Sequence, residues 1–395
     1  MTSKPEGAPL ATPMHARPPG DVEVAPVLDG LDKDLFVRFP ERIYRDDLHW
    51  VPPLLMERHD FLDPRKNPFF AHADVALFLA RRGGEVVGRI AAVEDRNFNA
   101  FQHSRTAYFG LYESVNDPGV AAALFATARG WARARGLDTL LGPMNLSTNY
   151  EVGLLVEGFD SDPYFMMPYN PRHYAALFEA CGLRKAKDLF AWERSAASPP
   201  PERFARIADR IRKAEGITIR SVDLSRFDAE VARIKEVYNA AWEQNWGFVP
   251  MTEAEFDKLA RDLKQLVVPE LALIVEDGGE PVAFSLTLPD LNQALKKVGG
   301  RLTWYGLPLG LARLLWHQRR IDRVRLMALG VKSGWRRRGL DAVLIVESIR
   351  RTRALGYRGG EVSWTLEDNE LINRAIESVG CSRSKVYRVY QSPTE

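Results

Sequence analysis

The feature that most constrains this chain is an internal repeat in which three motifs recur in the same order. The first motif reads as a strand, a Gly-Gly-Glu turn and a strand, which is typical of a β-hairpin. The second reads as a helix end, a glycine stop and a buried strand, and the third as a helix followed by a strand. The paired segments are 77–95 and 271–290, 131–145 and 351–369, and 176–192 and 374–391. Three matches in one order indicate two copies of one fold.

Each copy is predicted to run as a strand, one or two helices, an antiparallel hairpin, and then alternating strands and helices. This order predicts a fold of the broad α/β class (α+β, because the sheet is mixed). Helices cover the sheet, and the fold is built twice in tandem. Segment 196–202 is rich in Pro and Ser and is interpreted as the linker between domains 21–195 and 203–395. Residues 1–20 are Pro-rich, lack a hydrophobic core segment and are predicted to form a disordered tail.

Bulk composition narrows the classes of function. The 54 basic and 52 acidic residues leave a net charge of +2, which gives no whole-protein case for binding nucleic acid. The two cysteines fit a reducing compartment, and no His, Cys or Asp cluster has metal-ligand spacing. No uninterrupted apolar run approaches the ~18–20 residues that span a membrane. We therefore expect a cytoplasmic protein without a metal or a permanently bound cofactor, which at most lies on the inner membrane.

One segment of the second copy is predicted to bind an anion. Residues 324–331 read as a strand, 332–339 as a basic loop with glycines, and 340–355 as an amphipathic helix. A loop that enters a helix in this way collects backbone N–H groups and the positive helix end at one point, which suits a phosphate. Arg336, Arg337 and Arg338 add positive charge, and Gly339 lets the backbone approach a ligand closely. The alternative is a solvated basic turn whose glycine serves only helix entry.

The strand, loop and helix resemble motif A of the GCN5-related N-acetyltransferases (the GNAT family), a motif that cradles the pyrophosphate of coenzyme A. The matching residues are Val331, Arg336 and Gly339, whereas Asp341 stands where the family prefers Gly or Ala. Downstream, residues 364–381 resemble the family's Asn-led helix. Asn369 and Gly380 fall at the family spacing there, but Ile376 replaces the tyrosine that protonates the departing thiolate and Cys381 replaces Phe.

The first copy resembles the family in architecture and lacks its chemistry. Glu113 and Asp117 stand where a phosphate loop needs cations, and no Arg-x-x-Gly follows the strand. We interpret this copy as a degenerate domain that shapes the acceptor side. Its insertion contains Asn145 and Asn149 in a stretch dense in Asn, Tyr and Met, which predicts either a cavity lining or a packed loop.

Over residues 30–391 the chain resembles a group of bacterial tandem proteins that includes the bacterial ceramide synthases. The segments GPMNLSTN, MMPYNPRHY, WTLEDN and KVYRVYQ carry this resemblance. It implies an N-acyltransferase that moves a long acyl chain from acyl-CoA, or from an acyl carrier protein, to a lipid amine such as a sphingoid base. Two alternatives remain: an acetyl-CoA-dependent acetyltransferase of small molecules or peptides, and an inactive tandem protein that binds a ligand or membrane.

The insertion 291–321 in the second copy mixes leucines, aromatic residues and cations. This mixture suits an anionic bilayer surface, and a lid packed on the protein's own core is the alternative. We expect the following residues to contact membrane or substrate: Trp304, Tyr305, Leu311, Leu315 and Trp316.

The expected reaction is direct attack of an amine on the thioester, without an acyl-enzyme. Backbone N–H groups near Leu329 and Val331 are expected to polarise the thioester carbonyl. A protonated amine must lose a proton, and Glu367 and Asp368 are the predicted acceptors because they end the strand beside motif A. Tyr387 is the predicted donor of a proton to the thiolate, and Asn369 is expected to contact the donor.

Overall fold

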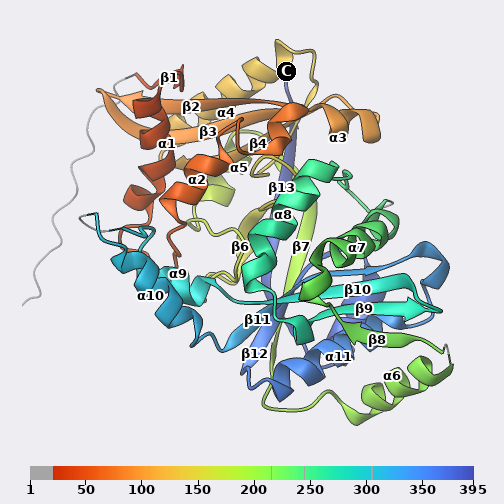
Figure 1. Cartoon of the computed structure of the whole chain (residues 1–395). Helices are drawn as coiled ribbons and strands as arrows, with labels where there is room; N and C mark the ends of the chain where they lie inside the picture. The colour runs from red at the N-terminus through yellow and green to blue at the C-terminus, as the bar shows by residue number, and fades with distance from the viewer. Residues whose placement is uncertain (1–20, 215, 244, 304–305) are drawn as a thin grey trace, which may run out of the picture.

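The computed structural model describes residues 21–214, 216–243, 245–303 and 306–395, so the predicted tail 1–20 and the residues Trp304 and Tyr305 lie outside the described part of the chain. Figure 1 shows two α/β halves, one above the other, joined by long strands through the centre. The order of elements repeats from one half to the other as the sequence predicts.

The first half holds seven strands and five α-helices among the described residues. The strands are β1 (Glu23–Pro26), β2 (Ala73–Arg82), β3 (Glu85–Asp95), β4 (Thr106–Ser114), β5 (Thr139–Gly142), β6 (Leu154–Glu157) and β7 (Arg184–Ser195). The helices are α1 (Gly30–Ile43), α2 (Leu55–Phe61), α3 (Arg96–Phe101), α4 (Pro118–Arg133) and α5 (Tyr174–Ala180).

The second half follows the same order with a longer excursion before its fourth strand. Its strands are β8 (Thr218–Ser221), β9 (Ala272–Asp277), β10 (Glu280–Pro289), β11 (Arg323–Val331), β12 (Gly359–Leu366) and β13 (Ser382–Pro393). Its helices are α6 (Glu202–Ala214), α7 (Phe227–Trp242), α8 (Glu253–Leu263), α9 (Asn292–Val298), α10 (Leu309–Gln318), α11 (Leu340–Ala354) and α12 (Glu370–Ser378). The insertion predicted at 291–321 thus contains α9 and α10.

The two predicted hairpins form as expected. Gly83 and Gly84 connect β2 to β3 with φ angles of 58° and 81°, and Gly278 and Gly279 connect β9 to β10 with φ angles of 56° and 93°. Two successive residues with positive φ make a tight turn whose twist matches the flanking strands, and glycine adopts that conformation without steric cost.

All described strands belong to one sheet, because the last strand of each half pairs with the other half. The order along the sheet is β1-β2-β3-β4-β5-β13-β7-β12-β11-β10-β9-β8, with β6 also paired to β13. Strand β7 of the first half therefore pairs with β12 of the second half, and β13 of the second half pairs with β5 of the first half. Strands β7 and β13 also pair with each other, and Figure 1 shows these two long strands side by side between the halves.

The core between the halves is apolar and continuous. A cluster of buried side chains from both halves includes Met144, Tyr164, Leu189, Val249 and Tyr387. Among the described residues, no helix is both long and apolar enough to cross a membrane.

Candidate functional site

The sheet opens between β11 and β12. The two strands pair in parallel over only four residue pairs, from Arg323 with Gly359 to Leu326 with Val362. Beyond this point β11 continues to pair with β10, and β12 continues to pair with β7, so the strands part from each other while each keeps its outer neighbour. The backbone edges of β11 and β12 that face each other across the split pair with no strand among the described residues.

The side chains along the split are partly exposed. Met327, Ala328 and Leu329 on β11, and Trp364 and Leu366 on β12, are all half-buried, although both strands are central in the sheet. Central strands of a helix-covered sheet are normally buried on both faces, so this partial exposure sets the split apart from the rest of the sheet. We call the opening between the two diverging strands the groove; the five side chains named here are apolar.

The groove leads to the basic loop at the start of α11. The backbone at Gly339 has a φ of 80°, a left-handed conformation that favours glycine, and a Cβ atom there would lie 2.7 Å from Ile211 Cδ1 on α6, so the Ile211 side chain would have to shift. Gly339 caps α11 without a side-chain hydrogen bond to the helix N–H groups. Arg336 Nη2 donates to the carbonyl oxygen of Ala241 at 2.6 Å, which ties the loop to α7. The Arg338 guanidinium stacks on the Trp335 ring at 4.5 Å.

In the first half, the equivalent split between β4 and β5 is filled by the protein itself. Asn145 Oδ1 accepts the backbone N–H of Leu111 at 2.8 Å, at the irregular position of β4. A Cβ atom on Gly110 would lie 1.9 Å from the carbonyl oxygen of Met144, so the two backbones are in direct contact. Every residue of β4 is buried, in contrast to β11. The segment after β5 therefore occupies the space that is open in the second half.

In the first half, the N-terminus of α4, which corresponds to the start of α11, is also occupied by the protein itself. Asp117 Oδ1 accepts the N–H groups of Gly119 and Val120 at 2.8 and 3.3 Å, and Asp117 Oδ2 pairs with Arg82 at 2.8 Å. An internal carboxylate thus takes the position at the start of α4 where a bound anion would sit. Glu113 is not part of this cap. It lies buried between the hydroxyl groups of Tyr44 and Tyr174, and burial raises its pKa to about 7.

The carboxylates predicted as proton acceptors lie at the far end of β12 and have lysine partners. Glu367 Oε2 lies 2.5 Å from Lys185 Nζ, and Glu367 Oε1 accepts the N–H of Asp188 at 3.0 Å. Asp368 Oδ2 lies 2.7 Å from Lys187 Nζ, whose hydrogen bond lowers the pKa of this exposed carboxyl. Both residues brace β12 against β7. Asn369 caps α12 and accepts the N–H of Ile372 at 3.5 Å.

A buried polar cluster at the closed end of the split was not found from the sequence. Arg325 and Glu361 are paired residues of β11 and β12, and they are 5% and 1% exposed. Arg325 Nε donates to Ser363 Oγ at 2.5 Å, and its Nη1 donates to the carbonyl of Phe165 at 2.6 Å. The signal was present, because a single charged residue stands in each of two predicted strands whose other residues are uncharged. Tyr387, predicted from the sequence, is fully buried and belongs to the same face.

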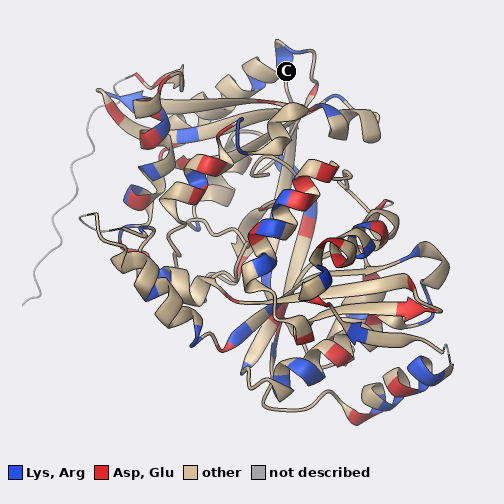
Figure 2. Ribbon diagram, in the orientation of Figure 1, with Lys and Arg blue, Asp and Glu red and all other residues tan. Residues whose placement is uncertain are grey.

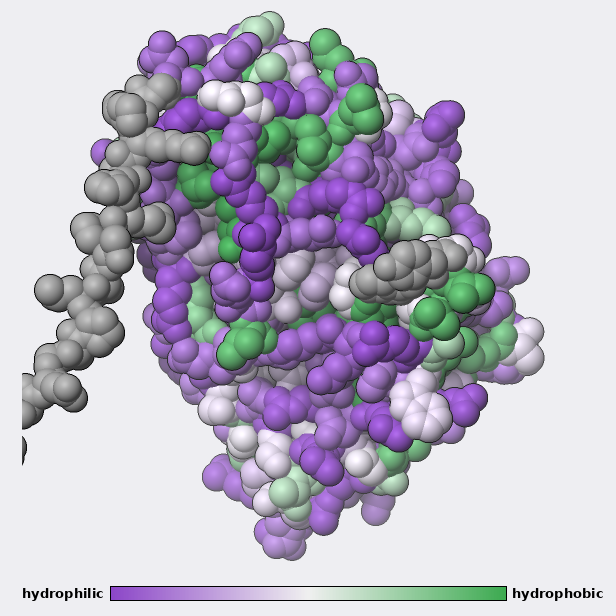
Figure 3. Space-filling model, turned by 90° about the vertical axis from the view of Figure 1, so that its left-hand side faces the viewer, coloured by the Kyte–Doolittle hydropathy of each residue, from purple (hydrophilic) through white to green (hydrophobic). Residues whose placement is uncertain are grey.

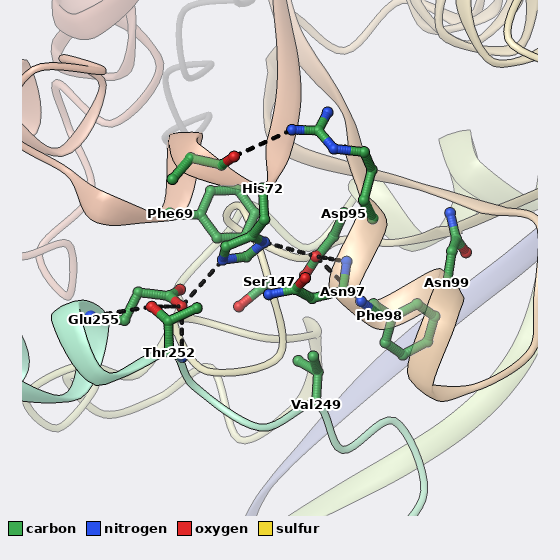
Figure 4. A network of polar contacts seen from close by, with 12 residues as sticks. Phe69, His72, Asp95, Asn97, Phe98, Asn99, Ser147, Val249, Thr252 and Glu255 are labelled. Carbon is green, nitrogen blue, oxygen red and sulfur yellow. Dashed lines mark hydrogen bonds and ion pairs between the residues drawn. The ribbon is translucent and has the colours of Figure 1, made fainter.

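A second polar network joins the two halves. Figure 4 shows the His72 imidazole between two carboxylates: Nδ1 lies 3.0 Å from Asp95 Oδ1 and Nε2 lies 3.0 Å from Glu255 Oε2. Asp95 also caps α3, and Glu255 forms a capping box with Thr252 at the start of α8. These hydrogen bonds outweigh the effect of burial, which opposes them, and raise the pKa of His72 to about 9. A charged histidine thus clamps α8 to the first half.

The first-half insertion packs on the second half. Asn149 Oδ1 accepts the Tyr238 hydroxyl at 3.0 Å, and its Nδ2 donates to the carbonyl of Val249 at 3.3 Å. Asn145, besides its bond to Leu111, donates to Glu151 at 2.6 Å. Both amides are therefore engaged within the protein, as expected for a packed loop.

Helix α10 has an unusual surface. Its outward side chains include Leu309, Leu311, Leu315 and Trp316, which are 42–56% exposed, and only Gly310 is buried. Figure 3 shows hydrophobic side chains gathered in this region of the face. Segment 291–321 contains six Lys or Arg residues and no Asp or Glu, and its ribbon is tan and blue in Figure 2. In contrast, the apolar side chains of α9 are buried, and its Lys296 pairs with Asp162 at 2.6 Å.

No protein-family model matches the chain. Curated proteins do match over most of their length. The bacterial ceramide synthase of Caulobacter vibrioides (strain NA1000 / CB15N) is 39% identical over 380 residues, covering 94% of this chain and 97% of that protein. Protein YghO of Escherichia coli (strain K12) is 37% identical over 368 residues, covering 91% and 92%.

Solved structures share the fold. A tandem GNAT protein from the clavulanic acid biosynthesis pathway superimposes with a TM-score of 0.53 at 13% identity, covering 95% of this chain and 99% of that one. The glucosamine N-acetyltransferase region of a fungal β-N-acetylglucosaminidase gives 0.55 at 15% identity, covering 95% and 38%. The predicted fold class, two GNAT-like units with a mixed sheet, is confirmed.

Proposed function

Since this chain belongs to the family of the bacterial ceramide synthases, we propose that it is an N-acyltransferase that moves a long acyl chain from a thioester to the amine of a sphingoid base. The product is an amide of the ceramide type. The observation that carries the proposal is the difference between the halves: the split of the second half is open, apolar and ends at a basic helix start, whereas the split of the first half is filled.

The donor is proposed to lie along the split. The start of α11 with its uncapped N–H groups, together with Arg336, Arg337 and Arg338, suits the phosphates of coenzyme A. Half-buried Leu329 and Trp364 suit an apolar arm between the strands. Backbone N–H groups near Leu329 and Val331 would polarise the thioester carbonyl. The same cations would also suit the acidic surface of an acyl carrier protein, so both donors belong in the test.

The reaction follows from positioning. The amine nitrogen attacks the thioester carbon, the carbon–sulfur bond breaks, and the amide and a free thiol leave. Holding both reactants in one groove lowers the entropic part of the barrier, and no covalent link to the protein is required. The amine is mostly protonated near neutral pH, so a side chain or water must take a proton before attack.

The acceptor and the acyl chain are both lipids, and the exposed helix α10 suits their source. We propose that α10 lies on an anionic bilayer at the cytoplasmic side of the inner membrane, with Leu311, Leu315 and Trp316 in the interface and the basic residues against headgroups. The complete lack of acidic residues in 291–321 favours an anionic surface over a lid packed on the protein.

The test uses the purified full-length chain with a sphingoid base and a matched series of donors: acetyl-CoA, palmitoyl-CoA and palmitoyl-acyl carrier protein. Amide formation is followed by mass spectrometry and thiol release by a colorimetric reagent. Long-chain amide with little acetyl transfer supports the proposal. Transfer of acetyl groups in preference to palmitoyl groups would replace it with a small-molecule acetyltransferase, and donor binding without any product would indicate an inactive binding protein.

A further inference from the structure

The face of the sheet that carries Arg325 and Glu361 holds more charged groups than a buried surface normally tolerates. Paired residues of adjacent strands point to the same face, so Glu361 faces the same way as Arg325 on β11 and Glu193 on β7. Lys385 and Tyr387 on β13 extend this face, because they pair with Ala191 and Leu189 of β7. The loop 158–165 and Asp290 cover it.

Nearly every charged member of this cluster has its own partner. Lys385 Nζ donates to the carbonyl and hydroxyl oxygens of Ser161 at 2.9 and 2.8 Å. Asp290 Oδ1 accepts the N–H of Phe165 at 2.9 Å. Glu193 pairs with Arg323 and accepts the Tyr164 hydroxyl at 3.0 Å. These contacts hold the covering loop against the sheet.

Glu361 differs from all of them. Neither of its carboxylate oxygens has a hydrogen-bond partner of ordinary geometry among the described residues, and its nearest cation is Arg325 Nε at 3.8 Å. The hydroxyl of Tyr387, on the same face, is buried and also lacks a partner within the described part of the chain. A buried carboxylate without a hydrogen bond of ordinary geometry is costly, so its presence calls for a functional reason.

The position of Glu361 supplies one. It stands in the last pair but one of the β11–β12 ladder, one residue before the strands part. The proposed donor groove begins at that point, which brings the carboxylate next to the closed end of the groove where a thioester and an amine would meet. Glu367 and Asp368, by contrast, lie at the open end of β12 in ion pairs with lysines.

Resting on the proposed acyl transfer, we propose that Glu361 takes the proton that the acceptor ammonium loses, directly or through one water molecule. The freed nitrogen then forms its bond to the thioester carbon, and the carbon–sulfur bond breaks. The second nitrogen proton passes to the departing sulfur, with the Tyr387 hydroxyl as its relay. The proton on Glu361 returns to solvent after release of the products.

The electrostatics of the cluster fit this role. Burial raises the pKa of Glu361 to about 7, and Arg325, Ser363 and Lys385 oppose that rise. Glu193 raises it further. A base whose pKa lies near the working pH is deprotonated often enough to act and basic enough to accept a proton.

The experiment measures kcat against pH for the wild type and for Glu361→Gln, with palmitoyl-CoA and a sphingoid base. The wild type should gain activity as the pH rises through about 7, where Glu361 loses its proton. The variant should lose this limb and about 100-fold or more in kcat at pH 7, while its affinity for palmitoyl-CoA stays unchanged. Glu94→Gln, which replaces a glutamate on β3 that lies near Arg135 and away from this cluster, is the control and should stay within a few-fold of wild type.

Other outcomes count against the proposal. A Glu361→Gln protein with the wild-type limb and near-full kcat overturns it and leaves the proposed function intact, and so does loss of the limb in Glu367→Gln or Asp368→Asn instead. A wild type that forms no amide with any donor contradicts both. If Glu361→Gln does not fold by circular dichroism, Glu361→Asp keeps the charge but withdraws the carboxylate, and undiminished kcat in that variant overturns the proposal.

Discussion

Asn145 Oδ1 accepts the backbone N–H of Leu111 at 2.8 Å, the same kind of edge N–H group that the second half leaves open along β11. With Asp117 capping α4, both ligand positions of the first half are filled by the chain itself. We therefore expect one coenzyme A site per chain. Isothermal titration with a non-reactive CoA analogue should give a stoichiometry of one, and two sites of equal affinity would contradict the assignment of the first half as degenerate.

The donor loop offers a direct test of where coenzyme A binds. Replacing Arg336 and Arg338 with Ala removes two cations proposed to hold phosphate, so the KM for acyl-CoA should rise about tenfold or more, which corresponds to ~1.4 kcal/mol. The KM for the amine should change little. Arg105→Ala with Arg172→Ala, which removes two exposed arginines of the first half, is the control and should leave both constants unchanged.

Helix α10 should decide whether the protein binds vesicles. Burying a large apolar side chain is worth ~1.5–3 kcal/mol, so Leu315→Ala with Trp316→Ala should weaken binding to anionic vesicles about tenfold or more. Leu355→Ala with Leu371→Ala removes two other exposed leucines, on different elements, and should bind as the wild type does. Vesicle co-sedimentation measures both. Added salt should weaken binding through screening of the arginines, and binding that ignores both salt and the α10 substitutions would favour the lid.

The clamp at His72 predicts how stability depends on pH. Its folded pKa is raised to about 9 from the ordinary 6.5, so its contribution is fully present below pH 6.5 and is lost as the pH rises through about 9. The melting temperature of the wild type should therefore fall over this range. His72→Gln should melt at a lower temperature at pH 6 and show a flatter slope, and an identical slope in both proteins would mean that His72 is not charged in the folded state.

Local sequence patterns predicted several of the strands, turns and helices correctly. The glycine-paired hairpins, the strand before the basic loop and the helix after it all follow from short-range periodicity and turn chemistry, and the structure has each of them. The pairing of β7 with β12 could not be predicted, because a strand's own residues do not specify which distant edge it joins. For the same reason, the sequence did not predict that the split between β4 and β5 is filled, with the Met144 backbone in contact with Gly110.

The sequence shows which charged residues lie near the helix starts, but it did not predict which contacts they make. Asp117 was interpreted only as an acid at a position where a phosphate loop needs a cation. Its carboxylate in fact caps α4 and pairs with Arg82, contacts that depend on the folded backbone. The sequence around Glu361 contained a stronger signal, a lone acid in an otherwise uncharged strand. Its lack of a hydrogen bond of ordinary geometry is visible only once the neighbouring strands and the loop over them are in place. The catalytic roles of Glu367, Asp368 and Tyr387 stay predictions.

The exchange of the last strands has a consequence for how such a chain can evolve. Strand β7, encoded in the first copy, supports one wall of the proposed donor groove in the second copy, because it pairs with β12 on the side away from the split. Deleting the first copy would remove that support and leave β12 as an unpaired edge, while deleting the second copy would remove β13 from beside β5. Neither copy can therefore be lost in evolution without exposing a strand edge of the other, even after it loses its own chemistry. Two fragments cut at the linker should form the complete sheet only when they are produced together.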